Sequence, residues 1–420
     1  MSAATGEIPR IDHPSAQPLI TPAFVLAWLV NFSQYLVFYL LVTTMALYAV
    51  REFAADDAAS GFASSSFVVG ATVARLVTGF IVDRLGRRRV MLAALAVTIL
   101  ACALYLPTAS LPLLIAVRIL HGFAYAFAST AVMAIVQSVI PAARRAEGTG
   151  FFALGTTLAT AVGPALGLFL VGAYSYGMLF AVALAATAIG LMLALFLRRP
   201  AEGTPARTDE EAEEHDEAVA ARKAEFSLSE ILHPAVVPIG LFMVLIGLSY
   251  AGVITYLNAY AVERDVATGA GLFFVAYALA MLVMRFVLGR VQDQRGDNIV
   301  VWFGIVCFVL ALVVLSAAQQ DWQVVVAGAL TGLGYGTLMP AAQAIAVSAV
   351  PADKLGTGIS TLLLLADVGI GLGPVLLGAL LSATGYGPMY AGLAVVVVVA
   401  GVFYHAVHGR HQAARRRQVA

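Results

Sequence analysis

The stretch Gly-Phe-Ile-Val-Asp-Arg-Leu-Gly-Arg-Arg-Arg, at residues 79–89, decides how the rest of the chain is interpreted. It follows one apolar segment, contains four arginines and precedes a second apolar segment. A related stretch, Gly-Arg-Val-Gln-Asp-Gln-Arg-Gly-Asp, occupies residues 289–297, and the offset between the two copies is 210. The same offset relates Arg75 to Arg285 and Pro141 to Pro351. These coincidences in one register indicate a tandem duplication.

The composition excludes a soluble globular protein, since 61% of the residues are apolar, 11% are charged and the mean hydropathy is +0.91. Helices that cross a membrane need about 20 apolar residues. Twelve segments meet this requirement, at residues 22–49, 61–83, 90–108, 111–140, 148–172, 176–197, 235–261, 268–290, 299–318, 322–349, 355–381 and 386–407. The sequence therefore predicts an all-α membrane protein with twelve transmembrane helices, in two six-helix bundles related by a parallel pseudo-twofold repeat.

The domain organisation follows from the polar stretches. We expect an N-terminal tail at 1–21, a first bundle at 22–197, a linker at 198–234, a second bundle at 235–408 and a basic tail at 409–420. The linker contains the acidic run at 209–214 and is typical of a solvated connection rather than a binding site.

The distribution of basic residues predicts the orientation. Of the 24 lysines and arginines, only Arg51 and Arg264 fall in loops on one side of the predicted bundles. Three more, Arg75, Arg118 and Arg285, lie inside apolar segments, and the other nineteen lie in the tails and in loops on the opposite side. By the positive-inside rule, both termini are cytoplasmic in a multi-pass protein of the cell (inner) membrane.

The loop after the second apolar segment carries a motif, Gly79-x-x-x-Asp83-Arg84-x-Gly86-Arg87-Arg88. It resembles the loop motif between helices two and three of the major facilitator superfamily. The resemblance implies that Asp83 docks at the start of helix eleven, where the helix dipole favours an anion, and helps to latch one side of a transporter shut. The latch residues are Gly79, Asp83, Arg84, Gly86, Arg87, Arg88 and, in the second copy, Asp293.

Two features qualify the latch hypothesis. Gly86 suits a tight reversal with positive φ, and Gly79 suits a close helix approach. A loop held on the cytoplasmic side by its charge alone would explain the arginines but neither the aspartate nor the glycines. In the second copy Gln294 and Asp297 replace basic residues, so we expect a weaker latch there.

The fourth segment contains Arg118-x-x-His121-Gly122, which is similar to the Arg-x-x-Gln-Gly motif of proton-coupled members of the superfamily. Arg118 and His121 share a helix face. Exposure of an arginine to lipid costs about 2.5–3.5 kcal/mol, so Arg118 is expected to face protein or water. Arg118 is near the outer end of its segment, so snorkelling remains an alternative, as does a structural role for His121.

The fifth segment contains Gly163, Pro164 and Gly167, which resemble the kink motif of the superfamily's exporters. The eleventh segment repeats the pattern with Gly373 and Pro374. The resemblance implies export, whereas small residues on membrane helices also simply permit close packing.

Asp367 is the only acidic residue well inside an apolar segment. An intramembrane carboxylate is a candidate proton carrier, so the predicted coupling residues are Asp367, His121 and Arg118. The alternative is a fixed ion pair with Arg75, Arg118 or Arg285. Because Arg75 and Arg285 are equivalent in the repeat, we expect a structural task for both, such as bridging the halves.

A substrate cavity between the bundles is predicted to be lined by Asn31, Gln34, Tyr35, Tyr39, Arg118, His121, Tyr125, Tyr250, Tyr256, Asn258, Gln343 and Asp367. The function implied is proton-coupled efflux of a small molecule by a monomer in the lipid bilayer, through alternating access. A proton-symporting importer, a lipid flippase or a nontransporting receptor on this scaffold are the alternatives. No nucleotide loop, nucleophile arrangement or metal cluster is recognisable, so we expect no enzyme activity, cofactor, metal or nucleic-acid partner.

Overall fold

The computed structural model describes residues 18–42, 44–197 and 232–410. The expected basic tail at 409–420, the N-terminal tail and the linker lie almost wholly outside these ranges. The description of the fold therefore concerns the two predicted bundles and the loops within them.

The first bundle consists of α1 (Pro22–Val42), α2 (Met45–Phe53), α3 (Asp57–Leu85), α4 (Arg87–Leu104), α5 (Leu111–Val139), α6 (Arg145–Ala173) and α7 (Tyr176–Phe196). The second consists of α10 (Val237–Glu263), α11 (Ala267–Arg285), α12 (Leu288–Arg295), α13 (Asp297–Ala317), α14 (Asp321–Ser348), α15 (Leu355–Thr384) and α16 (Tyr386–Tyr404). Short turns at Ala142–Arg144 and Ala352–Lys354 precede α6 and α15, and a π-helix at His405–Gly409 follows α16.

Eleven helices of the described chain are long and apolar enough to cross a membrane. The helix α4 is not among them because its 18 residues begin with Arg87, Arg88 and Arg89, which raise its charge. Its position in the first bundle is nevertheless that of α13 in the second, so it completes a set of twelve. The predicted twelve-helix fold is confirmed.

Two expected segments are interrupted. The segment 22–49 is divided between α1 and α2, and the segment 268–290 is divided between α11 and α12. The helix α3 begins earlier than expected because the Asp56 side chain accepts a hydrogen bond from the Ala59 N–H at 2.7 Å and caps it.

The two bundles repeat the same packing. In the first, α1 packs on α6, α3 on α5, and α4 on α5 and α7; in the second, α10 packs on α15, α11 on α14, and α13 on α14 and α16. A close backbone approach repeats with the same offset of 210. A Cβ on Gly122 would lie 1.9 Å from the Phe67 carbonyl oxygen, and a Cβ on Gly332 would lie 2.3 Å from that of Tyr277. The duplication is thus preserved in atomic contacts.

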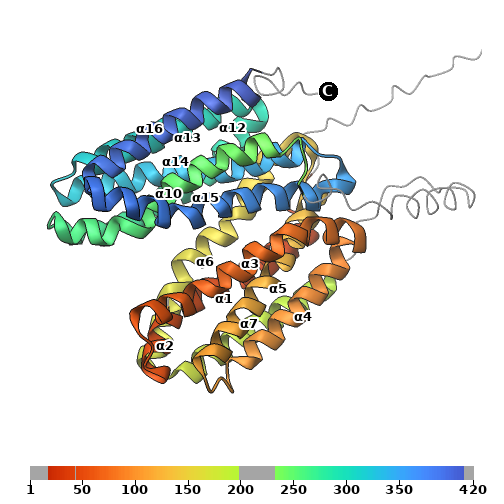
Figure 1. Ribbon diagram of the computed structural model, residues 1–420. Helices are drawn as coiled ribbons and strands as arrows, with labels where there is room; N and C mark the ends of the chain where they lie inside the picture. The colour runs from red at the N-terminus through yellow and green to blue at the C-terminus, as the bar shows by residue number, and fades with distance from the viewer. Residues whose placement is uncertain (1–17, 43, 198–231, 411–420) are drawn as a thin grey trace, which may run out of the picture.

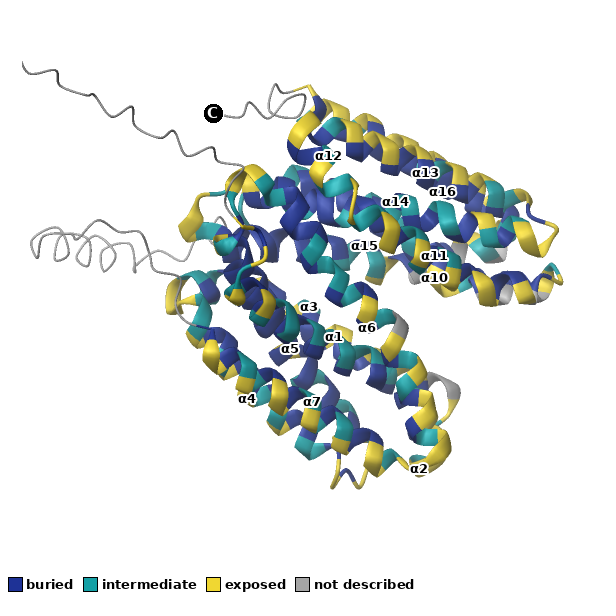
Figure 2. Ribbon diagram, turned by 180° about the vertical axis from the view of Figure 1, so that it is seen from behind, coloured by how far each residue is buried: buried dark blue, intermediate teal, exposed yellow. Residues whose placement is uncertain are grey.

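Burial is concentrated on the helix faces inside each bundle, while the outward faces are largely exposed (Figure 2). The exposed residues include many large apolar side chains, such as Leu168 and Phe169 on α6 and Val283 on α11. An apolar outer surface of this kind is suited to lipid and would be costly in water.

The bundles meet near one end of the molecule and diverge toward the other (Figure 1). We call the end with the loops at 84–89, 140–145, 286–297 and 349–355 the basic end, and the other end the far end. Contacts between the bundles run from α3 to α15 and from α6 to α11, α12 and α14.

Candidate functional site

The first contact between the bundles at the basic end joins Asp83, near the end of α3, to the start of α15. The Asp83 Oδ1 accepts a hydrogen bond from the Gly356 N–H at 2.8 Å, and its Oδ2 accepts one from the Thr357 N–H at 2.7 Å. The Thr357 hydroxyl donates a third, at 2.8 Å. These are free N–H groups in the first turn of a helix, where a carboxylate is favoured. Asp83 thus lies where the resemblance placed it.

The second contact is the repeat of the first. The Asp293 Oδ1 and Oδ2 accept hydrogen bonds from the Ala146 and Glu147 N–H groups at 2.9 and 2.8 Å, in the first turn of α6. The acceptor and both donor residues of this contact are at the positions that the repeat, with its offset of 210 residues, makes equivalent to those of the Asp83 contact. The residue at the position equivalent to Thr357 is Glu147, which has no hydroxyl group to donate to the second carboxylate.

Basic residues are still present at the second contact, although the sequence suggested that they had been lost. The buried Glu147 carboxylate accepts hydrogen bonds from the Arg144 Nε at 2.7 Å and from the Arg290 guanidinium at 3.0 Å. Arg290 belongs to α12 and Glu147 to α6, so this ion pair also joins the bundles. The replacements at 294 and 297 therefore did not remove the docking contact.

Glycines allow both contacts to form. A Cβ on Gly79 would lie 2.6 Å from the Thr357 Cα, and a Cβ on Gly289 would lie 2.6 Å from the Glu147 Cα. Gly86 has a φ of 89°, between α3 and α4, as the sequence predicted for a tight reversal.

The arginines of the motif have different tasks. The Arg87 guanidinium donates to the Ala352 carbonyl, in the turn before α15, and so reaches the other bundle. Arg88 donates to the Leu195 and Leu197 carbonyls at 3.0 and 2.7 Å and binds the free carbonyls at the end of α7. Arg84 lies over the Phe80 ring at 5.4 Å.

An ion pair crosses between the bundles farther from the basic end. The Arg75 Nε of α3 lies 2.6 Å from the Asp367 Oδ2 of α15. The side chain of Arg75 is 6% exposed and that of Asp367 is 26% exposed. Two turns closer to the basic end on α15, the Ser360 hydroxyl donates to the Arg75 carbonyl at 2.7 Å. Of the three arginines considered as partners for Asp367, the structure selects Arg75, which bridges the halves as expected.

Tyrosines form a cluster within each bundle. Tyr35 and Tyr39 of α1 and Tyr125 of α5 form a ring cluster, with Tyr35 perpendicular to Tyr125 at 5.6 Å. In the second bundle, Tyr250 of α10 stacks on Tyr335 of α14, with the two ring centroids 3.6 Å apart. The Tyr250 hydroxyl donates a hydrogen bond to the Tyr277 hydroxyl at 3.4 Å. Of the tyrosines predicted for the cavity, three thus cluster in the first bundle, and Tyr250 clusters with Tyr277 and Tyr335 in the second.

Arg118 and His121 do not line the space between the bundles in this structure, which corrects the prediction that both do so. Arg118 is 0% exposed and donates to the Ala63 and Ser64 carbonyls at 3.3 and 2.6 Å, between α3 and α5. His121 is 1% exposed, and its Nδ1 lies 3.1 Å from the Tyr105 hydroxyl. Both face the interior of the first bundle, so Arg118 does not snorkel either.

The remaining predicted cavity residues are less uniform. Asn31 and Gln34 are buried on α1, and the Asn31 amide donates to the Thr156 hydroxyl at 3.4 Å. Gln343 and Tyr256 are half-buried. The side chain of Asn258 is not among those that the structure describes.

The predicted kink residues lie against the first helix of each bundle. Cβ atoms on Gly163 and Gly167 would lie 2.6 Å from the Tyr39 Cβ and 2.8 Å from the Leu40 carbonyl oxygen. A Cβ on Gly373 would lie 2.5 Å from the Ala251 Cβ of α10. The helix α6 continues through Pro164, and the side chain of Pro374 is not described. Close packing of α1 and α10 is thus one role of these glycines.

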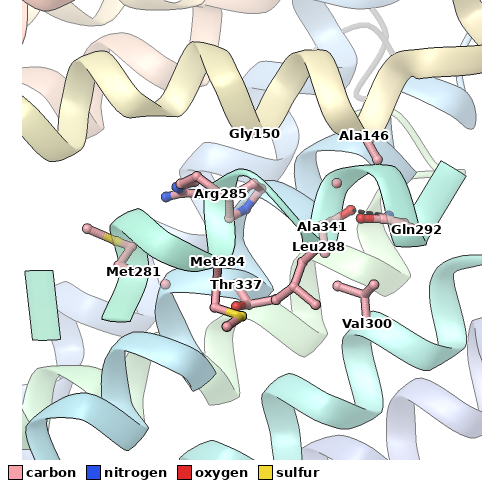
Figure 3. Close-up of a pocket in the computed structure, with 13 residues that line it drawn as sticks. Ala146, Gly150, Met281, Met284, Arg285, Leu288, Gln292, Val300, Thr337 and Ala341 are labelled. Carbon is pink, nitrogen blue, oxygen red and sulfur yellow. Dashed lines mark hydrogen bonds between the residues drawn. The ribbon is translucent and has the colours of Figure 1, made fainter. Parts of the chain in front are cut away.

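A narrow pocket between α6 and α11 contains a residue that the sequence did not assign to the site. Arg285 lines it together with Gly150, Met281, Met284, Gln292 and Thr337, and its side chain lies below α6 (Figure 3). Among the described residues, none forms an ion pair or hydrogen bond with the Arg285 guanidinium. The bridging task expected of Arg285 is therefore not performed by an ion pair. The repeat could have shown this, because the position equivalent to Asp367 is Thr157.

The chain is similar to several known transporters. The staphylopine export protein of Staphylococcus aureus strain Mu50 is 24% identical over 361 residues, covering 83% of this chain and 87% of that protein. The uncharacterised MFS-type transporter YhhS of Escherichia coli K12 is 27% identical over 130 residues, covering 30% of this chain and 32% of that protein.

Solved structures share the fold. The human organic anion transporter MFSD10 has a TM-score of 0.74 at 18% identity, covering 92% of this chain and 100% of that one. The proton:xylose symporter XylE has a TM-score of 0.71 at 14% identity, covering 92% of this chain and 95% of that one. A family model described as Major Facilitator Superfamily matches residues 27–269 and 265–419. The chain therefore belongs to the Major Facilitator Superfamily, and it is a multi-pass membrane transporter rather than an enzyme.

Proposed function

We propose that the chain exports a small molecule from the cytoplasm in exchange for protons. The name of the staphylopine export protein supports export, since that relative matches most of this chain. The basic end is assigned to the cytoplasm because nineteen of the 24 lysines and arginines lie in the tails and loops on that side. Both termini are then cytoplasmic, in a cell membrane.

The proposed cycle begins from the state observed here. The docking of Asp83 on α15 and of Asp293 on α6 holds the bundles together at the basic end, while their far ends diverge (Figure 1). This arrangement corresponds to a transporter open to the outside. The two aspartates, with Gly79, Gly86, Gly289 and the loop arginines, act as the latch of this state.

The ion pair between Arg75 and Asp367 is the observation that carries the proposal for proton coupling. It joins the two bundles at 2.6 Å, and Asp367 is 26% exposed, so a proton from the outside can reach it. Protonation removes the negative charge and leaves Arg75 without its partner, which weakens one bond that holds the basic end closed. The bundles then separate at the basic end with the proton bound.

The direction of exchange follows from this order of events. In the state open to the cytoplasm, Asp367 releases the proton and the substrate binds. The return to the outward state restores the ion pair and carries the substrate out. The tyrosines of the two clusters, from Tyr35 and Tyr39 to Tyr250 and Tyr335, supply aromatic and hydroxyl contacts to the substrate.

The proposal is tested with the variant Asp367→Asn in inverted membrane vesicles. The fluorescence of acridine orange reports the pH gradient across the vesicle membrane while a panel of anionic, neutral and cationic compounds is added. Compounds that dissipate the pH gradient with the wild type should fail to do so with Asp367→Asn. Exchange of the same compounds without a gradient should partly survive, because the amide resembles the protonated acid. Glu263→Gln, which changes an exposed carboxylate at the far end, is the matched control.

Two results would contradict the proposal. Full pH-driven transport in Asp367→Asn would exclude Asp367 as the proton carrier, and His121 would be tested next. Loss of folded protein in Asp367→Asn, with recovery in the double variant with Arg75→Gln, would indicate a fixed structural ion pair instead.

A further inference from the structure

Arg285 is a cation held inside the membrane part of the protein without a counter-ion. It is half-buried at the end of α11, and its Nε is buried without a hydrogen-bond partner. In the described part of the chain no carboxylate lies within 4.0 Å of it. A guanidinium that has its Nε desolvated without a hydrogen bond or counter-ion is costly, so its retention calls for a ligand that binds it for part of the cycle.

The repeat shows what is missing around Arg285. The equivalent Arg75 is paired with Asp367, and its carbonyl accepts a hydrogen bond from Ser360. At the positions displaced by 210, Asp367 is replaced by Thr157 and Ser360 by Gly150. The second copy of the contact therefore lacks the carboxylate of Asp367 and the hydroxyl group of Ser360.

Because the second copy lacks these two side chains, it has free volume beside Gly150 as well as an uncompensated positive charge on Arg285. An ideal Cβ on Gly150 would meet only the Arg285 carbonyl oxygen, at 3.4 Å. The pocket that results has room for about one water molecule, and Figure 3 shows the Arg285 side chain extending through it below α6. Because α6 and α11 belong to different bundles, separation of the bundles at the basic end widens this pocket.

The surroundings of Arg285 favour an anion with an apolar body. None of the residues that line the pocket is acidic, and Met281 and Met284 provide flexible apolar contacts. A guanidinium presents paired N–H donors that match a carboxylate.

We propose that Arg285 binds the anionic group of the transported molecule, which is an organic acid with an apolar or aromatic body. The proposal rests on the export function above and names its substrate class. The substrate enters from the basic end once α6 has moved away from α11, and its carboxylate takes the place that Asp367 occupies beside Arg75. Closure of the basic end then returns Arg285 to the narrow pocket, which has no room for the carboxylate, and so favours release on the other side.

The test uses three ligands of similar shape and different charge: 1-naphthoate, 1-naphthamide and 1-naphthylmethylammonium. The midpoint of thermal unfolding of the purified full-length protein in detergent is followed against ligand concentration. Naphthoate should stabilise the wild type, and the other two should not. Arg285→Gln should raise the half-saturating naphthoate concentration at least about tenfold, as expected for the loss of a charged hydrogen bond.

Two further variants and a control complete the design. Arg285→Lys keeps the charge and should retain the preference for naphthoate over the amide. Thr157→Asp restores a carboxylate at the position equivalent to Asp367, and it should weaken naphthoate binding as strongly as Arg285→Gln does. Arg295→Gln, an exposed arginine ten residues further along, should leave binding unchanged.

Naphthoate binding that survives both Arg285→Gln and Thr157→Asp would overturn the proposal. Equal stabilisation by acid and amide, or stabilisation by neither, would also overturn it. Because the measurement needs no pH gradient, it is separate from the export proposal. Selective binding of naphthoate without pH-driven flux would refute proton-coupled export and leave the anion site standing.

Discussion

Replacing Asp83 with asparagine should shift the protein toward the state that is open at the basic end. The carboxylate accepts three hydrogen bonds from the first turn of α15, two of them from backbone N–H groups. An amide offers one acceptor oxygen and no charge, so at least one of these bonds is lost and the others weaken. With charged hydrogen bonds at about 1.5–3 kcal/mol each, we expect a loss of about 3 kcal/mol, or about a hundredfold shift in the equilibrium.

The equivalent change at Asp293 provides the matched comparison. Asp293 accepts hydrogen bonds from two backbone N–H groups in the first turn of α6. The carboxylate of Glu147 lies in the same turn of α6, so neutralising Asp293 also relieves repulsion between like charges. We therefore expect a smaller loss, about 2 kcal/mol.

Distances between two spin labels, measured by double electron–electron resonance, report the equilibrium between the state open at the basic end and the state open at the far end. Spin labels at Leu106 and Trp322, which are exposed at the far ends of the two bundles, report their separation after the buried Cys102 and Cys307 are replaced with alanine. The short-distance population should rise in Asp83→Asn and rise less in Asp293→Asn. Equal shifts in the two variants, or no shift in Asp83→Asn, would refute the reasoning from contacts.

Two further predictions concern stability. Gly122→Ala should lower the unfolding midpoint with a loss of about 2–3 kcal/mol, because its Cβ would lie 1.9 Å from the Phe67 carbonyl oxygen; Gly172→Ala, with open space around it, should not. Burial lowers the pKa of His233, which lies before α10, so the folded state binds fewer protons there than the unfolded state does. The contribution of His233 to the stability of the folded state is therefore present above its unfolded pKa and is lost as the pH falls. Acidification from about pH 7 to pH 5 should destabilise the wild type more than His233→Gln. Thermal unfolding of both proteins at the two pH values measures this difference.

The repeat and the apolar segments made the fold predictable. Each segment had to supply its own hydrogen bonds in lipid, so its length alone indicated a helix. The offset of 210 then paired the halves, and it also relates the docking of Asp83 on Gly356 and Thr357 to that of Asp293 on Ala146 and Glu147. The positive φ of Gly86 was predictable for the same reason, because few other residues permit that reversal.

The orientation of individual side chains was not predictable. A helix that is apolar all round gives no periodic signal of which face meets its neighbours, so the inward rotation of Arg118 and His121 in α5 could not be foreseen. The break after Arg285 was hidden for a similar reason, since Phe-Val-Leu follows it, and two threonines at 43 and 44 are too few polar residues to mark the break after Val42. The partner of Asp367 was left open among three arginines, because sequence spacing does not show which faces of α3 and α15 meet.

The duplication also explains why the two halves are not interchangeable. Both copies contain a docking aspartate, and a latch on one side of the interface alone would let the bundles pivot. The next pair of positions has diverged: Arg75 faces Asp367, while Arg285 has Thr157 at the equivalent position. One copy thus holds a balanced ion pair suited to a proton, and the other holds an excess positive charge suited to an anion. Exchange of a proton for an anion then follows from one repeated contact that has its carboxylate in only one of the two copies.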